Sequence, residues 1–318
     1  MSMDKMNLEP IARRLTTVLL LSLSVWLIGS RDAAAVETKL DLNAGYRTDD
    51  LNWNIASDLS GTMTPNVLSE LTWHTLRIAQ LSGGLQLTGS DGLHFRATAD
   101  YGWIRSGDNQ DSDYLGDNRT LEFSRTNNDA SGDNVWDLSL ALGYRFRYAS
   151  DRTATYLTPL VGYSRHAQNL RITNANQTIP ATGSIPGLDS TYQSRWEGRW
   201  IGVEFLTDTP NDVNAYFRLE HHWADYSGEA NWNLRTDLQH PRSFDQDANG
   251  TGNVLSVGFL TVPKFNHWSV RVGLDYQRWT TDPGTNRAYF SDGTIGVTRL
   301  NSVEWKSWAL SLGLQRLM

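Results

Sequence analysis

The sequence lacks cysteine, a second long apolar run and an excess of positive charge. Without cysteine, disulfides, thiolate nucleophiles and cysteine metal sites are excluded. Only residues 15–29 form a long apolar run, so the chain is not a helical membrane protein with several spans. The net charge of −7 argues against a nucleic-acid partner, because phosphate backbones are bound by basic surfaces.

Aromatic residues are abundant, with 13 Trp and 12 Tyr, and they occur in alternating segments. In residues 93–103 the apolar set alternates with a polar set, namely Leu93, Phe95, Ala97, Ala99, Tyr101 and Trp103 against His94, Arg96, Thr98, Asp100 and Gly102. Successive side chains of a strand point to opposite faces, so the segment predicts a strand with one apolar and one polar face. Residues 136–146, 215–223, 268–277 and 302–314 show the same alternation.

The links between these segments alternate in length. Short links are expected at residues 89–92, 148–154, 208–212 and 263–266, and long polar links at 48–65, 106–133, 173–190, 228–249 and 281–300. Bacterial outer-membrane barrels have short periplasmic turns and long outer loops. We therefore predict an all-β fold: a single ten-stranded antiparallel transmembrane β-barrel in the bacterial outer membrane. The alternative is a soluble, lipocalin-like barrel with its apolar face inward.

The N-terminus has the features of an export signal. Arg13 and Arg14 precede the apolar run, and Ala33, Ala34 and Ala35 follow it. A run of this length is short for a spanning helix, which needs about 20 residues. We predict a signal peptide at 1–35 and the barrel at 36–318, the alternative being an uncleaved anchor.

The polar faces carry charged residues that must avoid lipid. An arginine on the lipid face at the bilayer midplane costs about 2–4 kcal/mol. Arg96, Arg218 and Arg271 are therefore expected to point into the barrel, with Asp100, Glu220 and Asp275 available as partners. A ten-stranded barrel is narrow, so an ion-paired interior predicts a filled lumen.

Several segments resemble the omptins, ten-stranded outer-membrane proteases. Ser69-Glu70-Leu71-Thr72-Trp73 resembles the omptin Ser-x-x-x-Trp opening, and Asp111-Ser112-Asp113-Tyr114 resembles the Asp-x-Asp-aromatic signature. Tyr101-Gly102-Trp103 ends the preceding strand, and Val161-Gly162-Tyr163 lies at the place of the omptin Gly-Tyr. The resemblance in strand order and loop rhythm covers nearly the whole chain after residue 35.

The resemblance implies a catalytic pair at Asp111 and Asp113. In omptins an Asp-x-His pair on the other side of the groove completes the site, and together the two pairs activate a water molecule. Here Glu229-x-Asn231 falls near that position and carries no histidine. Asn cannot act as a general base, and His221, His222 and His240 are not placed by spacing alone. Glu229 is the candidate that remains on that side.

The omptin lipopolysaccharide motif, Tyr-x-Glu-x-Arg, is also changed. The matching run is Tyr163-Ser164-Arg165-His166-Ala167, which keeps only the tyrosine. Arg165 can still donate charge-assisted hydrogen bonds to a phosphate. The resemblance therefore implies lipopolysaccharide contact at Tyr163 and Arg165, in altered geometry.

Residues 245–250 fit the opening of a calcium loop, Asp-x-Asp-x-Asn-Gly, but Ser256 stands where a bidentate carboxylate is needed. A polar turn can have the same sequence pattern without binding a metal ion. We predict no metal and no cofactor, and leave open whether the acidic loops bind calcium.

These observations predict an omptin-like outer-membrane barrel that is catalytically degenerate and acts in surface binding or adhesion. Its partners are then membrane lipid, lipopolysaccharide and a protein or peptide ligand at the outer loops. One alternative is an omptin-type endopeptidase that uses Asp111 and Asp113. The third is a small-solute channel, which the filled lumen disfavours.

Overall fold

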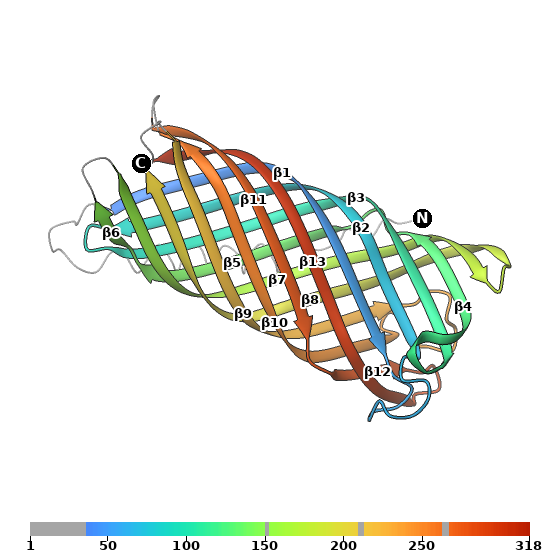
Figure 1. The fold of residues 1–318 in the computed structure, drawn as a ribbon. Coiled ribbons are helices and arrows are strands. Elements are labelled where there is room, and N and C mark those ends of the chain that lie inside the picture. Colours follow the sequence, from blue (N-terminus) through green and yellow to red (C-terminus); the bar gives the residue numbers. More distant parts are fainter. Residues whose placement is uncertain (1–35, 150–152, 209–212, 263–266) are drawn as a thin grey trace, which may run out of the picture. The chain divides into compact units, whose positions relative to one another are not determined.

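A computed structural model describes residues 36–149, 153–208, 213–262 and 267–318 of the chain. These residues form one antiparallel sheet that closes on itself (Figure 1). The predicted signal peptide at 1–35 lies outside the described residues, as do the whole predicted short link at 263–266 and parts of two others, at 150–152 and 209–212. In the described part, no helix is long and apolar enough to cross a membrane.

Strands pair in chain order, and β1 pairs with β13 from Lys39–Leu317 to Ile55–Leu300, which closes the ring. The strands are β1 (Val36–Ile55), β2 (Ser69–Gly89), β3 (Leu93–Gly116), β4 (Thr120–Asp129), β5 (Asn134–Tyr144), β6 (Phe146–Ala149), β7 (Ala154–Ile179), β8 (Gly183–Asp208), β9 (Val213–Asn231), β10 (Phe244–Thr261), β11 (Trp268–Thr281), β12 (Gly284–Tyr289) and β13 (Ile295–Leu317). A short 3-10 turn, η2 (Asp117–Arg119), joins β3 to β4. β4, β5 and β6 follow one another along a single strand position between β3 and β7, and β11 and β12 do the same between β10 and β13. The described strands therefore form a ring of ten, as predicted.

The strands are much longer than the membrane requires. β7 and β8 have 26 residues each, whereas about 9–11 residues suffice to cross a bilayer in a barrel. The extracellular halves of the strands therefore extend beyond the membrane as a continuous sheet. The predicted long links are wrong in this respect: the expected link at 173–190 is a hairpin with only residues 180–182 outside its strands. Both faces are polar there, which hid the strand signal.

The outer wall has an apolar band bordered by aromatic side chains, as the alternation predicts. Leu138, Leu140 and Leu142 of β5 are each about half exposed to the outside. Exposed aromatic residues border the extracellular edge at Tyr46, Trp103, Tyr163, Trp223 and Trp308, and the periplasmic edge at Tyr144, Phe146, Phe205, Phe259 and Trp268. Aromatic girdles of this kind anchor a barrel at the two lipid–water interfaces.

The periplasmic half of the lumen holds the predicted charged residues. Arg96 is 2% exposed, binds Glu220, and lies 3.6 Å from Glu204. Arg218 donates to Glu204 at 2.9 Å. The inward orientation and the Arg96–Glu220 pair confirm the prediction.

The other two expected partners differ from the prediction. Arg271 donates to the Tyr216 hydroxyl at 2.9 Å and lies 3.5 Å from Asp41. Asp100 accepts a hydrogen bond from Gln80 at 3.2 Å. Asp275 lies across from Asp100 and pairs with no arginine among the described residues. Pairing is set by which strands face each other across the ring, and an alternation pattern does not contain that information.

The extracellular half of the lumen is filled by an aromatic core that the sequence analysis missed. Trp279 and Trp305 stack with ring centroids 5.5 Å apart, and both are fully buried. Trp53, Trp73 and Trp196 are buried in the same cluster. These five tryptophans point inward and fill the ring, whereas the aromatic girdles of outer-membrane barrels lie at the two membrane interfaces.

Candidate functional site

Asp111 and Asp113 lie together at the extracellular mouth, on the part of β3 beyond the apolar band. Asp111 is opposite Leu71 of β2, and Asp113 is opposite Ser69. Leu71 is buried in the aromatic core, so the face that the two carboxylates share is the inner face. The structure thus brings the predicted pair to the upper edge of the core, facing the mouth.

Burial governs the protonation of this pair. Removal from water raises the pKa of Asp111 from 3.8 to about 8, and the charge of Asp113 adds to the rise. Burial also raises the pKa of Asp113, opposed by hydrogen bonds to Ser69 and Ser124 and by the charge of Arg235. At neutral pH, Asp111 therefore holds a proton.

Arg235 approaches the pair from the loop between β9 and β10. Its charge lowers the pKa of both carboxyl groups. The guanidinium is itself held by Asp237, with two hydrogen bonds of 2.8 and 2.7 Å. Arg235 is thus the basic side chain that acts on both carboxyl groups of the pair.

Glu229 is not brought to the pair. Along β9 the inward side chains are those of even number, and Tyr226, Gly228 and Ala230 are buried. Glu229 points to the outer wall, where it is exposed and lies 3.8 Å from Arg242. A shift of one residue moves a side chain to the other face of a sheet, and this is why the position assigned by resemblance fails.

The histidines named in the sequence analysis lie elsewhere. His221 is on the outer wall and bonds to Asn253 at 2.9 Å. His222 is in the lumen, 3.1 Å from Ser164 and 3.2 Å from Glu220. His240 is on the loop after β9, where its ring nitrogens contact Asn231 at 2.7 Å and the Arg235 carbonyl at 3.2 Å. Within the described part of the chain, none of the three bonds to Asp111 or Asp113.

The floor of the mouth is aromatic. Trp73 stacks on Tyr192 with centroids 5.2 Å apart. Trp53 lies 5.8 Å from Tyr192 and 5.6 Å from Phe244. The signal in the sequence was available for Trp53, which continues the inward alternation of β1. In β2 a bulge between His74 and Arg77 shifts the alternation, so Trp73 is out of phase with the inward residues that follow it. Such a floor offers ring faces to a bound chain and no proton-transfer group.

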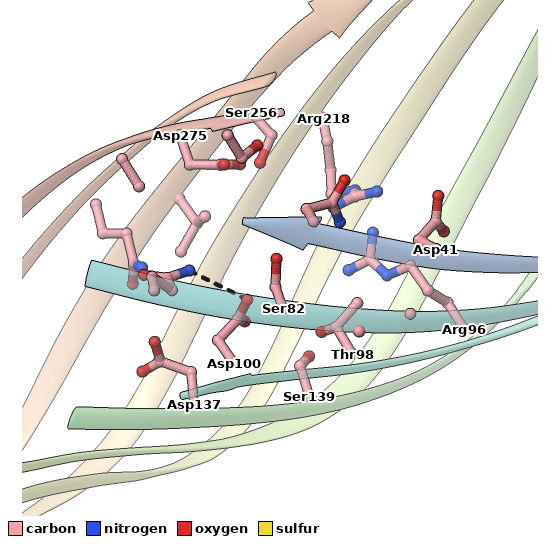
Figure 2. A pocket seen from close by; sticks show the side chains of 18 of the residues that line it. Asp41, Ser82, Arg96, Thr98, Asp100, Asp137, Ser139, Arg218, Ser256 and Asp275 are labelled. Carbon is pink, nitrogen blue, oxygen red and sulfur yellow. Dashed lines mark hydrogen bonds between the residues drawn. The ribbon is translucent and has the colours of Figure 1, made fainter. Parts of the chain in front are cut away.

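A cavity of about 130 Å³ lies in the lumen on the periplasmic side of the aromatic core. Figure 2 shows Asp100 and Asp137 on one side of this chamber and Asp275 with Ser256 on the other. Arg96 and Arg218 lie toward one end (Figure 2). The volume suits several water molecules, which would hydrate the carboxylates.

On the extracellular side of the chamber, charged and aromatic side chains form a layer of hydrogen bonds and ring contacts. Arg47 bonds to Asp49 at 2.7 Å and to Asp137 at 2.6 Å. Its guanidinium also lies 5.4 Å from the centre of the Trp305 ring. His166 bonds to Asp137 at 2.8 Å and packs on Trp279 at 4.7 Å. This layer separates the chamber from the extracellular mouth.

Tyr163 and Arg165 lie side by side on the outer wall, at the upper edge of the apolar band. The Tyr163 hydroxyl donates to Glu197 of β8 at 2.9 Å, and Arg165 lies 3.3 Å from the same carboxylate. Arg165 also stacks on Trp136 at 5.5 Å. The carboxylate that is missing from the sequence motif is thus supplied by the neighbouring strand.

The calcium-like segment 245–250 forms part of β10, paired with β9 and in part with β12. Asp245 pairs with Arg242 and lies 3.3 Å from Arg287, and Asp247 also binds Arg287. Among the described residues, no group of three or more His, Cys, Asp and Glu side chains is arranged to hold a metal ion.

Asp111→Asn should stabilise the barrel in a pH-dependent way. The folded protein keeps Asp111 protonated up to about pH 8, whereas the unfolded chain ionises it near pH 3.8. The wild type therefore loses stability as pH rises between these values, and the asparagine variant does not. We expect little difference near pH 4 and a gain near pH 8 of at least about 2–4 °C, the shift that 1 kcal/mol produces in a domain of moderate size, because a difference of one pKa unit already corresponds to about 1.4 kcal/mol.

The measurement is thermal unfolding in detergent, followed by tryptophan fluorescence across this pH range. Exposed Asp108→Asn, on the same strand, controls for the loss of one negative charge. An equal gain at both ends of the pH range would contradict the burial of Asp111.

The fold can be compared with known proteins. A family model described as Pom: Protochlamydia outer membrane protein matches residues 41–318. The outer membrane protease OmpT from Escherichia coli has a similar structure, with a TM-score of 0.73 over 89% of this chain and 97% of that chain, at 14% identity. The translocator domain of the autotransporter NalP from Neisseria meningitidis covers 96% of this chain and 95% of its own, at 11% identity and a TM-score of 0.36. No curated protein sequence matches the chain.

The OmpT likeness confirms the omptin-like barrel, and at 14% identity it concerns the fold alone. The outer-membrane family model agrees with the predicted location in the bacterial outer membrane. The family model spans nearly all of the described barrel. The chain belongs to the family of Protochlamydia outer membrane proteins.

Proposed function

We propose that this chain is a surface-exposed binding barrel that holds a peptide segment at its extracellular mouth without hydrolysing it. The proposal rests on the side chains of β9, the strand that the omptin resemblance sets against the carboxylate pair. The inward positions at the end of β9 are Gly228 and Ala230, and Glu229 points outward.

Hydrolysis needs a group that takes a proton from water at the moment of attack. A positioned general base contributes about 10²–10⁴ in rate, and histidine is the usual one. At this mouth the opposing charge is Arg235, which has no accessible basic form near neutral pH. The arrangement therefore supports recognition better than catalysis.

A peptide with a basic side chain fits the mouth. Asp111 and Asp113 offer carboxylate oxygens, and the rings of Trp73 and Tyr192 offer apolar faces below them. A bound cation favours the ionised form of Asp111, so binding competes with its proton. Affinity for basic peptides should then be higher above pH 8 than below it.

The test uses the refolded full chain and a library of fluorescent peptides that contain arginine or lysine. We expect binding without cleavage, and we expect Asp111→Asn/Asp113→Asn to weaken it about tenfold or more, since a hydrogen bond to a charged group contributes about 1.5–3 kcal/mol. Asp108→Asn is the matched control, an exposed carboxylate on the same strand.

Two outcomes would overturn the proposal. Cleavage that disappears in Asp111→Ala/Asp113→Ala would make the protein an endopeptidase with a rebuilt base. Peptide binding that is equal in the wild type and the double asparagine variant would remove the mouth as the binding site.

We also propose that the outer wall contacts lipopolysaccharide phosphate at Tyr163 and Arg165. Support comes from the position of this pair at the border of the apolar band, with Glu197 orienting both side chains. Other exposed basic residues lie on β2, β3, β8, β11 and β13, at Arg77, Arg105, Arg199, Arg278 and Lys306. Arginine beside a phosphate forms short, charge-assisted hydrogen bonds.

Arg165→Ala should weaken lipopolysaccharide binding about tenfold, the equivalent of 1.4 kcal/mol. The measurement is the rise in unfolding temperature as lipopolysaccharide is added to the detergent-solubilised barrel. Arg316→Ala is a matched control, because Arg316 stacks on Trp268 at 5.6 Å at the periplasmic edge. Equal losses in both variants would indicate loss of packing on tryptophan and not of a phosphate contact.

A further inference from the structure

A polar pocket lies on the outer wall of the barrel, on the extracellular parts of β8, β9, β10 and β12. Its volume is about 320 Å³, within the range of about 300–1,000 Å³ that is usual for small-molecule sites. Gln193 and Arg195 of β8 line this outer-wall pocket on one side, and Asp247 of β10 and Arg287 of β12 line it on the other. It contains neither the carboxylate pair of the mouth nor the tyrosine and arginine proposed to contact lipopolysaccharide.

The register of the strands explains the shape of the pocket. Ser227 of β9 lies between Arg195 of β8 and Asp247 of β10. Glu229 follows two residues later on the same outward face. Side chains that face each other on neighbouring strands are about 4.5–5.5 Å apart. Because the side chain of Ser227 is small, the longer side chains around it enclose a depression with Ser227 on its floor.

The charges of the pocket cancel. Three arginines and three carboxylates line it, namely Arg195, Arg242 and Arg287, and Glu229, Asp245 and Asp247. Arg287 binds Asp247 and lies 3.3 Å from Asp245. Arg242 binds Asp245 and lies 3.8 Å from Glu229. A charged ligand would have to compete with these pairs, whereas an uncharged polar ligand leaves them intact.

Two of these side chains keep unused hydrogen-bonding capacity. Within the described strands, the Arg195 guanidinium donates to the Gln193 side chain and bonds to no carboxylate. Glu229 is about half exposed, and no side chain in the described part of the chain donates a hydrogen bond to its carboxylate. A guanidinium has five N–H donors, and a carboxylate accepts only. The pocket therefore offers free donors and free acceptors close to its floor.

This combination selects the chemistry of the ligand. A hydroxyl group both donates and accepts, whereas a carboxylate only accepts and an ammonium group only donates. Planar guanidinium and carboxylate groups can also bind two neighbouring oxygen atoms at once. An uncharged ligand with adjacent hydroxyl groups, that is, a saccharide, therefore matches the pocket better than an anion or a cation does.

The height of the pocket agrees with a surface saccharide. Trp223 lies in the extracellular aromatic girdle, and Ser227 is four residues farther along β9. At about 3.3 Å per residue, this is roughly 13 Å along the strand. The pocket thus faces sideways just beyond the lipid, where it can meet sugars attached to membrane lipids or to other surface molecules.

We propose that the outer-wall pocket binds an uncharged saccharide segment, with Arg195 donating hydrogen bonds to its hydroxyl groups and Glu229 accepting hydrogen bonds from them. The saccharide belongs either to a lipid of the same membrane or to a free or protein-bound glycan, since both carry the same hydroxyl groups. This inference goes beyond the proposed peptide binding and does not depend on the carboxylate pair of the mouth.

The first arm of the test measures binding of the refolded, fluorescently labelled full chain to an array of oligosaccharides of glucose, galactose, mannose and N-acetylglucosamine. We expect Ser227→Phe, which fills the floor, to weaken binding at least about tenfold, the factor that one hydrogen bond to a charged group is worth. Thr72→Phe is the matched control and should bind as the wild type does. Thr72 points outward between the buried Leu71 and Trp73 of β2 and does not line the pocket.

The second arm measures the rise in unfolding temperature on addition of lipopolysaccharide with its core sugars, compared with lipid A without them. A larger rise with the core sugars, lost in Ser227→Phe and kept in Thr72→Phe, assigns the saccharide to the same membrane. Binding to the array together with equal rises for the two lipids assigns it to a free or protein-bound glycan.

Three outcomes would overturn the proposal. One is that neither arm shows binding that Ser227→Phe removes. Another is an equal loss in Ser227→Phe and Thr72→Phe, and the third is stronger binding to sialylated or sulfated oligosaccharides than to neutral ones. Asp111→Asn/Asp113→Asn should leave both arms unchanged, so a failure of the peptide mouth is distinguished from a failure of the outer-wall pocket.

Discussion

The cost of turning a charged side chain toward lipid governs the arrangement of this barrel. About 2–4 kcal/mol per arginine at the midplane is enough to fix which face of each strand is inside. Arg47, Arg96 and Arg218 accordingly lie in the lumen, and each is bound to at least one carboxylate. Burying a charge without a partner is costly, so the inward charges must meet across the ring.

The same constraint divides the interior into two layers. Within the membrane, the polar face of each strand supplies ion pairs and the lining of a small polar chamber. Above it, the strands continue beyond the lipid, and the inward positions carry tryptophan and tyrosine instead. The aromatic layer gives the mouth a rigid floor, and burial against that floor raises the pKa of Asp111. A closed lumen and a shaped mouth suit a barrel that binds at its surface.

The sequence predicted the features that depend on alternation alone: the ring, the apolar band, and the inward arginines. It failed where the answer depends on which strands face each other. Asp100 and Asp275 were expected to pair with arginines, but the partners of Arg271 are Tyr216 and Asp41. Glu229 failed for a local reason, because the resemblance placed it one residue from an inward position and so on the opposite face. The strand extension at residues 173–190 escaped detection because most of its residues are polar, so it shows no alternation of apolar and polar side chains.

The closed lumen is tested most directly by electrical recording from the full chain inserted in planar lipid bilayers. The interlocked layer of Arg47, His166, Trp279 and Trp305 predicts no steady unitary conductance. Stable, reproducible conductance steps in the wild type would contradict a barrel that is closed by its aromatic core, and would favour a solute channel.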